Sequence, residues 1–468
     1  MSNKHEVVAL RSDLDVAFTV DEVQAAAKAL RKSTASGPDA VAAACLANGS
    51  FTLHAALTDV FNFSWVHGVI PLEWKKADAF ALFKKGDHSD PSSYRIISVT
   101  STVMRLFERV VYARLSSHLD SRRFFTDSQA GFRHGLSTVD CIYKLLRDVY
   151  STTRSRKRLP VVFLDIIKAF DRVPHDSLLY KLHTQAGVWG KAWGWLHAFL
   201  SDRKFRVCQG DHASEWYTAL AGVPQGCVLS PLLFAIFIND LDEHQLAVVL
   251  SLFADDAAVW PSLRSRRQYR SQLRVLRDFC THVDAWSAMW GLEFSKDKTQ
   301  MVVFDNKMYE PPAYDALSLG AHPVLPSDSY RYLGVTFQRN ARWNMHFVVA
   351  KCKLTANLIA RINHRVRGPP AAITITLVNR VLIPQMSYAL AFWRLTKAQE
   401  RILDQVLAVP LRRALGLHRS ASAIRTLWEC GVPTISTVRR RAIVQSVSRA
   451  VRCSDQRNPL PSLLVRDM

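Results

Sequence analysis

The chain has 468 residues, of which 49% are hydrophobic and 22% charged, and this composition excludes a disordered or fibrous protein. The length exceeds one ordinary hydrophobic core and predicts two or three packed subdomains. Lys and Arg number 61 against 40 Asp and Glu, for a net charge of +21, and residues 341–468 hold 21 of the basic residues and 5 of the acidic ones. A surplus concentrated in one region favours a nucleic-acid partner over a basic surface that serves only solubility.

In the first zone of the chain, the sequence predicts helices before and after one strand. Thr19 and Glu22 have capping-box spacing ahead of an amphipathic helix, and residues 103–119 again have helical periodicity. Between them, residues 77–83 predict a strand that leads into the basic loop 84–87.

The second zone begins at residue 159. Residues 160–164 form a short apolar run typical of a buried strand. Two long helices are expected over 177–200 and 230–241, with a hairpin between them formed by 205–207 and 215–220.

A further strand is expected over residues 246–253, and the chain then reverses at Ala254, Asp255 and Asp256 into an apolar run, 257–260. From residue 343 onwards the pattern is helical, basic and aromatic. The sequence therefore predicts three zones, which are mixed α/β, sheet-containing and helical.

The cysteines predict buried, reduced thiols, because no two have the two-to-four-residue separation of a zinc site. They are Cys45, Cys141, Cys208, Cys227, Cys280, Cys352, Cys430 and Cys453. No stretch resembles a signal peptide or reaches the ~18 apolar residues of a membrane span, so we expect a nuclear or cytoplasmic protein with no membrane partner.

Three carboxylates stand where strands end. Asp165 follows the strand 160–164 directly, and Asp255 and Asp256 lie at the reversal. If the two strands pair, these carboxylates meet at one edge of a sheet, where their repulsion would require divalent cations such as Mg²⁺. An Asp-Asp turn alone is more often structural than catalytic, so the surrounding sequence has to decide.

Three surrounding motifs resemble the reverse transcriptase of non-LTR (LINE-type) retrotransposons. Phe253 to Asp256 resembles the (F/Y)-x-D-D motif, residues 163–173 are similar to the preceding palm motif, and residues 222–234 are similar to GVPQGSVLSPLLF. Shorter similarities extend the resemblance to roughly residues 18–441; they lie at 37–39, 84–95, 129–133, 291–299, 332–335, 411–416 and 428–433.

The resemblance implies an α+β right-hand polymerase. Residues 1–158 would form an N-terminal extension and the fingers, 159–340 a palm whose antiparallel sheet carries the catalytic aspartates, and 341–468 a helical basic thumb or connection region. The implied activity is RNA-directed DNA polymerisation, in which two Mg²⁺ ions, or Mn²⁺ in their place, assist transfer of dNTPs to a primer 3′-hydroxyl. The implied partners are an RNA template and a DNA primer.

The resemblance assigns Asp165, Asp255 and Asp256 as metal ligands, with the carbonyl of Ile166 completing a site. Lys298 resembles the lysine proposed as a general acid towards pyrophosphate, and its alternative role is that of a helix-end lysine.

The incoming dNTP would be held by residues of the fingers and the palm. Phe170 resembles the steric gate against a ribose 2′-hydroxyl, with a core aromatic as the alternative. Gln225 and Gly226 would approach the incoming base pair. The triphosphate ligands are expected to be Arg95, Arg133 and, unless it is only a solvated surface residue, Lys84.

Nucleic acid would be held by a primer-grip element and by the thumb. Tyr332, Leu333 and Gly334 match the primer-grip pattern. The thumb arginines expected to contact the template–primer backbone are Arg361, Arg365, Arg367, Arg412 and Arg413.

Four positions depart from the family pattern without removing a metal ligand. Ala40 replaces Gly after Gly-Pro-Asp, Ile96 replaces Pro, Ile167 replaces Ser, and Ser295 replaces Asn. These departures put catalytic efficiency in doubt more than the fold.

Two other functions fit the same sequence. A group II intron maturase shares the palm motifs, although the residues that make up the motifs here favour the non-LTR type. A domesticated or decayed copy would bind RNA without polymerising, and loss of a metal-binding aspartate would distinguish it. No endonuclease, Cys/His knuckle or RNase H pattern is recognisable, so we expect a polymerase core that is truncated, excised or dependent on other proteins such as a separate endonuclease.

Overall fold

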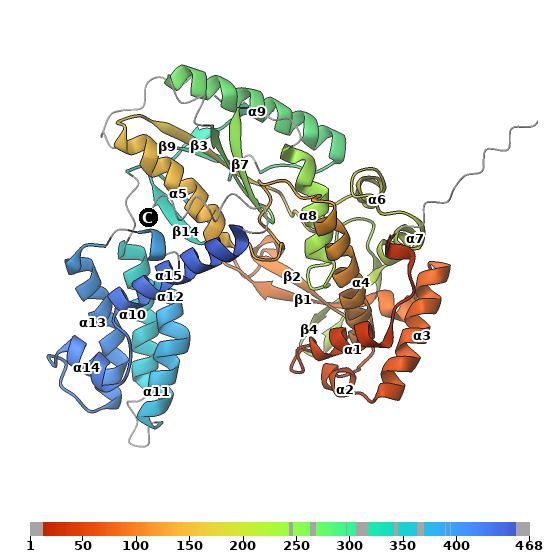
Figure 1. Ribbon diagram of the computed structural model, residues 1–468, viewed down its shortest axis with the longest axis horizontal. Coiled ribbons are helices and arrows are strands. Elements are labelled where there is room, and N and C mark those ends of the chain that lie inside the picture. Colours follow the sequence, from red (N-terminus) through yellow and green to blue (C-terminus); the bar gives the residue numbers. More distant parts are fainter. Residues whose placement is uncertain are drawn as a thin grey trace, which may run out of the picture.

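The computed structural model describes residues 13–242, 247–262, 268–295, 297–305, 317–340, 345–362, 369–388, 390–393 and 395–454. It combines helices with two larger sheets in which most strand pairs are antiparallel. In Figure 1 the N-terminal helices lie at the right, the sheet that carries β3 lies at the top, and the helices of the last quarter form a group at the lower left. The α+β class predicted from the sequence is confirmed.

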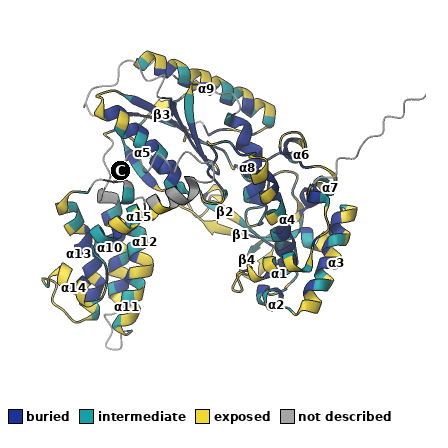
Figure 2. Cartoon of the chain, viewed as in Figure 1, coloured by how far each residue is buried: buried dark blue, intermediate teal, exposed yellow. Residues whose placement is uncertain are grey.

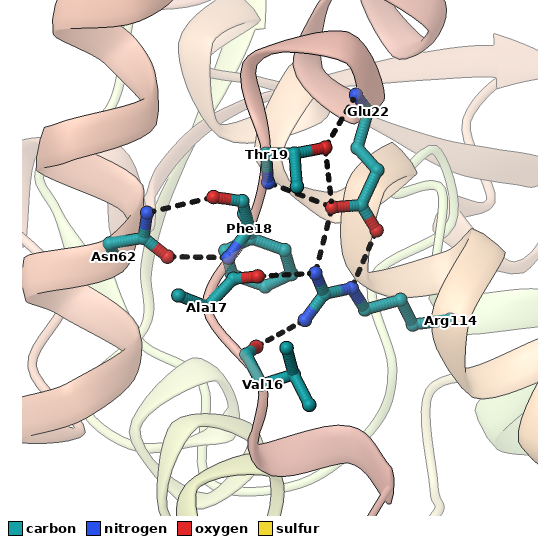
Figure 3. A network of polar contacts seen from close by, with 7 residues as sticks. All are labelled: Val16, Ala17, Phe18, Thr19, Glu22, Asn62 and Arg114. Carbon is teal, nitrogen blue, oxygen red and sulfur yellow. Dashed lines mark hydrogen bonds and ion pairs between the residues drawn. The ribbon is translucent and has the colours of Figure 1, made fainter.

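One arginine links two segments of the N-terminal region through hydrogen bonds. Its elements are η1 (Asp13–Asp15), α1 (Val20–Lys28), α2 (Ala43–Ala47), α3 (Phe51–His67), η2 (Leu72–Lys75) and α4 (Thr102–Ser121). The predicted capping box is present, since the side chains of Thr19 and Glu22 each accept the other's backbone amide. Arg114 of α4 donates to the same Glu22 carboxylate at 2.7 Å and to the Ala17 carbonyl at 2.7 Å (Figure 3). Helix α4 therefore holds the segment that precedes α1.

The Gly-Pro-Asp element caps a helix. The Asp39 carboxylate accepts the Ser101 hydroxyl and the Thr102 amide, each at 2.7 Å, at the start of α4. A Cβ on Gly37 would lie 2.2 Å from the Thr100 carbonyl oxygen, so no other residue fits there. Ala40 has φ +53°, in the left-handed region that favours glycine, which gives a physical reason for the Gly of the family pattern.

A first sheet joins segments from two of the predicted zones. Strands β1 (Lys76–Phe83) and β2 (Tyr94–Thr100) are antiparallel and are linked through η3 (Pro91–Ser93). Strand β4 (Lys204–Gln209) pairs parallel to β1 and antiparallel to β5 (His212–Ala213) and β6 (Tyr217–Thr218). The predicted hairpin thus forms, but it extends the sheet of the first zone, so a boundary at residue 158 does not separate two independent units.

The second sheet has the order β12-β9-β3-β8-β7. Its strands are β3 (Leu159–Asp165), β7 (Val248–Phe253), β8 (Asp256–Pro261), β9 (Gln300–Phe304) and β12 (Leu325–Pro326). Central strand β3 pairs antiparallel with β8 on one side and β9 on the other. All residues of β3 except the terminal Asp165 are buried, and Figure 2 shows the sheet around β3 mostly in the colour of buried residues.

Alternating side chains of β3 enter two different cores. Val162 and Leu164 belong to the core that contains α8 (Ser230–Ile238) and α9 (Tyr269–Trp290). Val161 and Phe163 belong to the core that contains α5 (Thr138–Arg154) and the hairpin of β13 (Ser329–Tyr332) and β14 (Val335–Gln338). Because a strand sends successive side chains to opposite faces, β3 holds both layers together. A short hairpin, β10 (Ser318–Leu319) with β11 (His322–Pro323), lies next to α9.

The expected helix over 177–200 is wrong, because the chain breaks it into α6 (His175–Thr184) and α7 (Gly190–Leu200). Gly187, which lies between the two helices, has a φ of +65°, a conformation that an α-helix excludes. The helix expected over 230–241 forms as α8 and continues into η4 (Asn239–Asp242). Between these elements the fully buried Lys181 ammonium pairs with the Asp240 carboxylate at 2.5 Å.

The helical character predicted from residue 343 onwards is confirmed. The elements are α10 (Met345–Ile362), α11 (Ala371–Leu377), the π-helix η6 (Val378–Leu382), α12 (Ile383–Ser387), η7 (Leu390–Phe392), α13 (Lys397–Ala414), α14 (Ala423–Glu429) and α15 (Ile435–Ser454). They share a separate core that includes Cys352, Leu382, Leu407 and Leu427.

Seven cysteines, all but Cys453, have described side chains, and these seven are free thiols, four of them buried. Among the described helices, none is both long and apolar enough to cross a membrane.

Ala40→Gly should stabilise the protein by up to about 1 kcal/mol, because glycine removes the left-handed strain while the added entropy of the unfolded chain offsets part of the gain. Chemical denaturation measures the change. Ala25→Gly, at an exposed position inside α1, is the control and should instead destabilise by about 1 kcal/mol. Equal losses in both variants would contradict the strain at Ala40.

Candidate active site

The central sheet brings the three aspartates to one edge. Asp165, the last residue of β3, is the direct cross-strand partner of Asp256, the first residue of β8. Ala254 and Asp255 form the two-residue turn between β7 and β8, and Ala254 adopts φ +56°. Directly paired residues of antiparallel strands have Cβ atoms about 4.5–5.5 Å apart. The strand pairing expected from the sequence therefore forms.

Burial and mutual repulsion disfavour the charged forms of two of these carboxyl groups. Burial raises the pKa of Asp256 to about 6, and the charges of Asp255 and Asp165 add to the increase. Burial also raises the pKa of Asp255, with a further contribution from Asp165, while Arg95 and Lys298 oppose the increase. The edge of the sheet thus gathers carboxyl groups whose charged forms are disfavoured.

Lys298 supplies one cation to this edge. Its Nζ lies 3.1 Å from Oδ2 of Asp165, and its side chain is 70% exposed. Ser295 links the backbones of the two residues in this ion pair. Its amide donates to the Asp165 carbonyl at 2.6 Å, and its hydroxyl accepts the Lys298 amide at 3.4 Å. An Asn at position 295, as in the family pattern, would offer a comparable acceptor, so Ser295 preserves the turn.

The first sheet faces the same site through a glycine contact. The Ser98 amide of β2 donates to the Gln225 carbonyl at 2.7 Å, and a Cβ on Gly226 would lie 2.1 Å from the Ser98 carbonyl oxygen. The Gln225 amide lies 3.4 Å from the Asp171 carboxylate. Only glycine at position 226 allows the two segments to approach this closely.

Phe170 is half-buried beside this turn. Its ring stacks on Phe234 with centroids 4.8 Å apart and meets Phe132 edge-on at 6.4 Å. Its carbonyl accepts the Val223 amide at 2.7 Å. The residue packs against the core and keeps an exposed part, so its position is compatible with both of the roles considered for it.

A cavity of about 640 Å³ adjoins the aspartates. Asp255 and Asp256 line it from the sheet, Leu333 and Gly334 from the β13–β14 turn, and Lys351 from α10. The cavity therefore lies where the aspartate edge, the hairpin and the last group of helices meet.

Comparison with known proteins agrees with this geometry. Residues 82–337 match the family model of reverse transcriptase (RNA-dependent DNA polymerase).

The chain belongs to the reverse transcriptase family.

Its curated relatives are polymerases of mobile elements. It is 31% identical over 335 residues to a probable RNA-directed DNA polymerase from transposon BS of Drosophila melanogaster, with 70% of this chain and 36% of the relative covered. It is 28% identical to the RNA-directed DNA polymerase from mobile element jockey of the same organism, with 61% and 31% covered. The chain thus spans about a third of the length of these relatives, and the predicted non-LTR type is confirmed.

Among solved structures, the chain aligns with apo telomerase from Candida tropicalis at a TM-score of 0.42 and 12% identity, with 83% of this chain and 71% of that one covered.

The side chains predicted to bind the triphosphate differ in their exposure and in their hydrogen bonds within the protein. Arg95 is exposed on β2, and its charge acts on Asp255. Lys84 is exposed just after β1, and its charge acts on Asp171. Arg133 instead donates to the carbonyls of Thr126 and Gln129, each at 3.0 Å, and burial lowers its pKa. Its guanidinium supports the preceding loop.

Two predicted nucleic-acid contacts are corrected because their side chains are buried. Tyr332 is 1% exposed, its hydroxyl bonds to Ser251 at 3.2 Å, and burial raises its pKa well above the ordinary value. Arg412 is 7% exposed and donates to Gln405 at 2.9 Å. The alternation of β13 and the periodicity of α13 turn these two side chains inwards.

The remaining predicted nucleic-acid residues are exposed or lie outside the described residues. Arg361 and Arg413 are exposed on α10 and α13. Leu333 and Gly334 line the cavity. Arg365 and Arg367 lie outside the described residues.

Sequence reasoning missed several residues of the site. Asp171 follows Phe170, and burial raises its pKa while Lys168 and Lys84 oppose the increase. Asp171 lies within the palm motif around Phe170, and that motif could have identified it as a residue of the site. No local signal pointed to the cavity-lining residues Thr138, Lys351, Gln385 and Tyr388, because they come from segments far apart in the sequence.

In metal-free buffer, Asp256→Asn should stabilise the protein at pH 7.5 by about 2 kcal/mol, because a raised carboxyl pKa means that the folded state disfavours the charge. The difference should shrink as the pH falls through 6 and vanish below about 4, where Asp256 is protonated in both the folded and the unfolded states. Thermal unfolding across pH measures the effect. Asp211→Asn, at an exposed turn, is the control and should change little. A destabilised Asp256→Asn protein at pH 7.5 would contradict the repulsion.

Proposed function

We propose that this chain polymerises DNA on an RNA template, transferring dNTPs to a primer 3′-hydroxyl. The observation that carries the proposal is the direct pairing of Asp165 with Asp256 beside the Asp255 turn, within a sequence of the reverse transcriptase family. Residues 1–158 would provide the N-terminal extension and fingers, 159–340 the palm, and 341–468 the thumb. Strands β4 to β6 would join the fingers, since they extend the sheet of β1 and β2.

The donor set suits divalent cations chemically. Asp165, Asp255 and Asp256, together with the carbonyl of Ile166, would hold two Mg²⁺ ions, because hard oxygen donors and concentrated negative charge are what Mg²⁺ prefers. Within the described ranges, no three His, Cys, Asp or Glu side chains already converge on one point as metal ligands do. Binding would therefore require side-chain rotation and release of Asp165 by Lys298. When bound, the ions would supply charge neutralisation at the attacking and leaving oxygens.

The other residues would position the substrates. Arg95 and Lys84 approach the carboxylates from the fingers with side chains free to bind a triphosphate, and a guanidinium binds phosphate oxygens through paired hydrogen bonds. Lys298, once released from Asp165, would donate a proton to the departing pyrophosphate. Gln225 and Gly226 would provide the surface against which the new base pair packs, because the missing Cβ brings the turn against β2.

Asp255→Asn should lower polymerisation by roughly 10³-fold, the equivalent of about 4 kcal/mol of lost transition-state stabilisation. Binding of the template–primer duplex should change little, because the substitution leaves the basic surfaces intact. Primer extension on poly-rA/oligo-dT with Mg²⁺ and then Mn²⁺ measures the first effect, and fluorescence anisotropy the second. Asp211→Asn should retain full activity. Wild-type protein that binds the duplex but extends it with neither ion would favour the RNA-binding alternative.

Phe170→Val should raise ribonucleotide incorporation relative to deoxyribonucleotide incorporation by roughly tenfold, the size expected when one steric contact is removed. Single-nucleotide extension with matched dNTP and rNTP measures the ratio. Phe234→Val is the matched control, because it removes the buried ring stacked on Phe170 and should lower stability without opening space at the sugar. An unchanged ratio in Phe170→Val would assign Phe170 to the core.

A further inference from the structure

The β13–β14 turn that lines the catalytic cavity has an unfavourable backbone. Leu333 and Gly334 have φ of +48° and +79°, as a two-residue turn of type I′ requires at both positions. Glycine adopts this conformation freely, whereas leucine does not. A leucine held there needs support from outside the hairpin.

Tyr388 provides that support from the thumb. Its hydroxyl lies 2.8 Å from the Leu333 carbonyl oxygen and 3.0 Å from Oγ1 of Thr138, the first residue of α5. A tyrosine hydroxyl carries one proton and the carbonyl only accepts, so Tyr388 donates to Leu333 and accepts from Thr138. One oxygen thus links the end of α12, the hairpin turn and the start of α5.

The Tyr388 ring also limits the space beside the turn. A Cβ on Gly334 would lie 3.6 Å from Cε1 of Tyr388, which is ordinary van der Waals contact. Tyr388, Leu333 and Gly334 line the same cavity as Asp255 and Asp256. Movement of the turn would therefore change the shape of the cavity next to the carboxylates.

A second observation indicates a polar occupant of this cavity. Gln385, one helical turn before Tyr388, also lines it. Its side-chain oxygen is enclosed and has no hydrogen-bond partner within the part of the chain that the structure describes. Buried polar atoms are normally satisfied, so an occupant with hydrogen-bond donors fits. Lys351 on the same wall suits a phosphate group.

We propose that Tyr388 is a positioning residue that fixes the Leu333–Gly334 turn, so that the cavity holds the 3′-terminal nucleotide of the primer in line with Asp255 and Asp256. The inference rests on the proposed polymerase function. Without the hydroxyl the turn moves, and the primer 3′-hydroxyl spends less time in reacting geometry. Small misplacements of a reacting atom lower the rate much more than they lower binding.

Tyr388→Phe removes only the hydroxyl, and Thr138→Ala removes one of its two contacts. Tyr388→Phe should lower the single-turnover extension rate by about tenfold and Thr138→Ala by about threefold, with the dissociation constant of the template–primer duplex and the unfolding temperature unchanged. Tyr180→Phe, on the remote helix α6 and 57% exposed, is the matched control and should behave as wild type. A wild-type rate in Tyr388→Phe, or a loss explained entirely by a lower unfolding temperature, would overturn the proposal.

Amide hydrogen exchange of residues 330–338 in the free protein separates this inference from the polymerase function. Tyr388→Phe should exchange about five- to tenfold faster there than wild type, because the turn loses its support. Unchanged exchange overturns the positioning role even if extension is slow. If wild type extends no primer while exchange still rises in Tyr388→Phe, the polymerase proposal fails and the role of Tyr388 in extension fails with it.

Discussion

The antiparallel pairing of β3 with β8 is the constraint on which the rest of the structure depends. It makes Asp165 and Asp256 direct cross-strand partners and presents Asp255 in the adjoining turn, so backbone hydrogen bonds hold like charges together at one edge. Burial raises the pKa of Asp256 to about 6, so this edge of the sheet disfavours the charged form of its carboxyl group. Two cores, one on each face of β3, supply the stability that opposes the repulsion. Active sites that hold like charges close together commonly lower the free energy of unfolding of an enzyme.

The first sheet contacts the turn at residues 225–226 so closely that no side chain fits at position 226. Ser98 of β2 binds the Gln225 carbonyl, and Gly226 packs against the Ser98 carbonyl oxygen without a Cβ. Strand β4 follows β3 in sequence and yet pairs with β1, so the chain leaves the second sheet, extends the first sheet and then returns to the second. Arg95 stands on β2 of the first sheet, which also includes β4. Its backbone is therefore held in this sheet, and only its side chain can move towards Asp255.

The C-terminal helical region, residues 345–454, contacts the β13–β14 hairpin through the buried Trp393 as well as through Tyr388. Its helices have a core of their own, and Tyr388 links them to the Leu333–Gly334 turn and to Thr138 through a side chain that is 40% exposed. The π-helical stretch Val378–Leu382 lies just before α12, and such stretches change the direction of the side chains that follow.

The sequence by itself determined the family, the three aspartates, the strands on either side of them and the helical character of the last quarter, because these features depend on local patterns and on motifs that survive divergence. It also indicated that Gly226 and Phe170 lie near the substrate. Only the tertiary structure decided that Tyr332 and Arg412 face inwards, that Arg133 serves its own loop, that β4 belongs to the sheet of β1, and that Tyr388 reaches Leu333. The reason is physical: burial and side-chain partners arise from segments distant in sequence, and a motif specifies a residue without specifying which neighbours compete for its polar atoms.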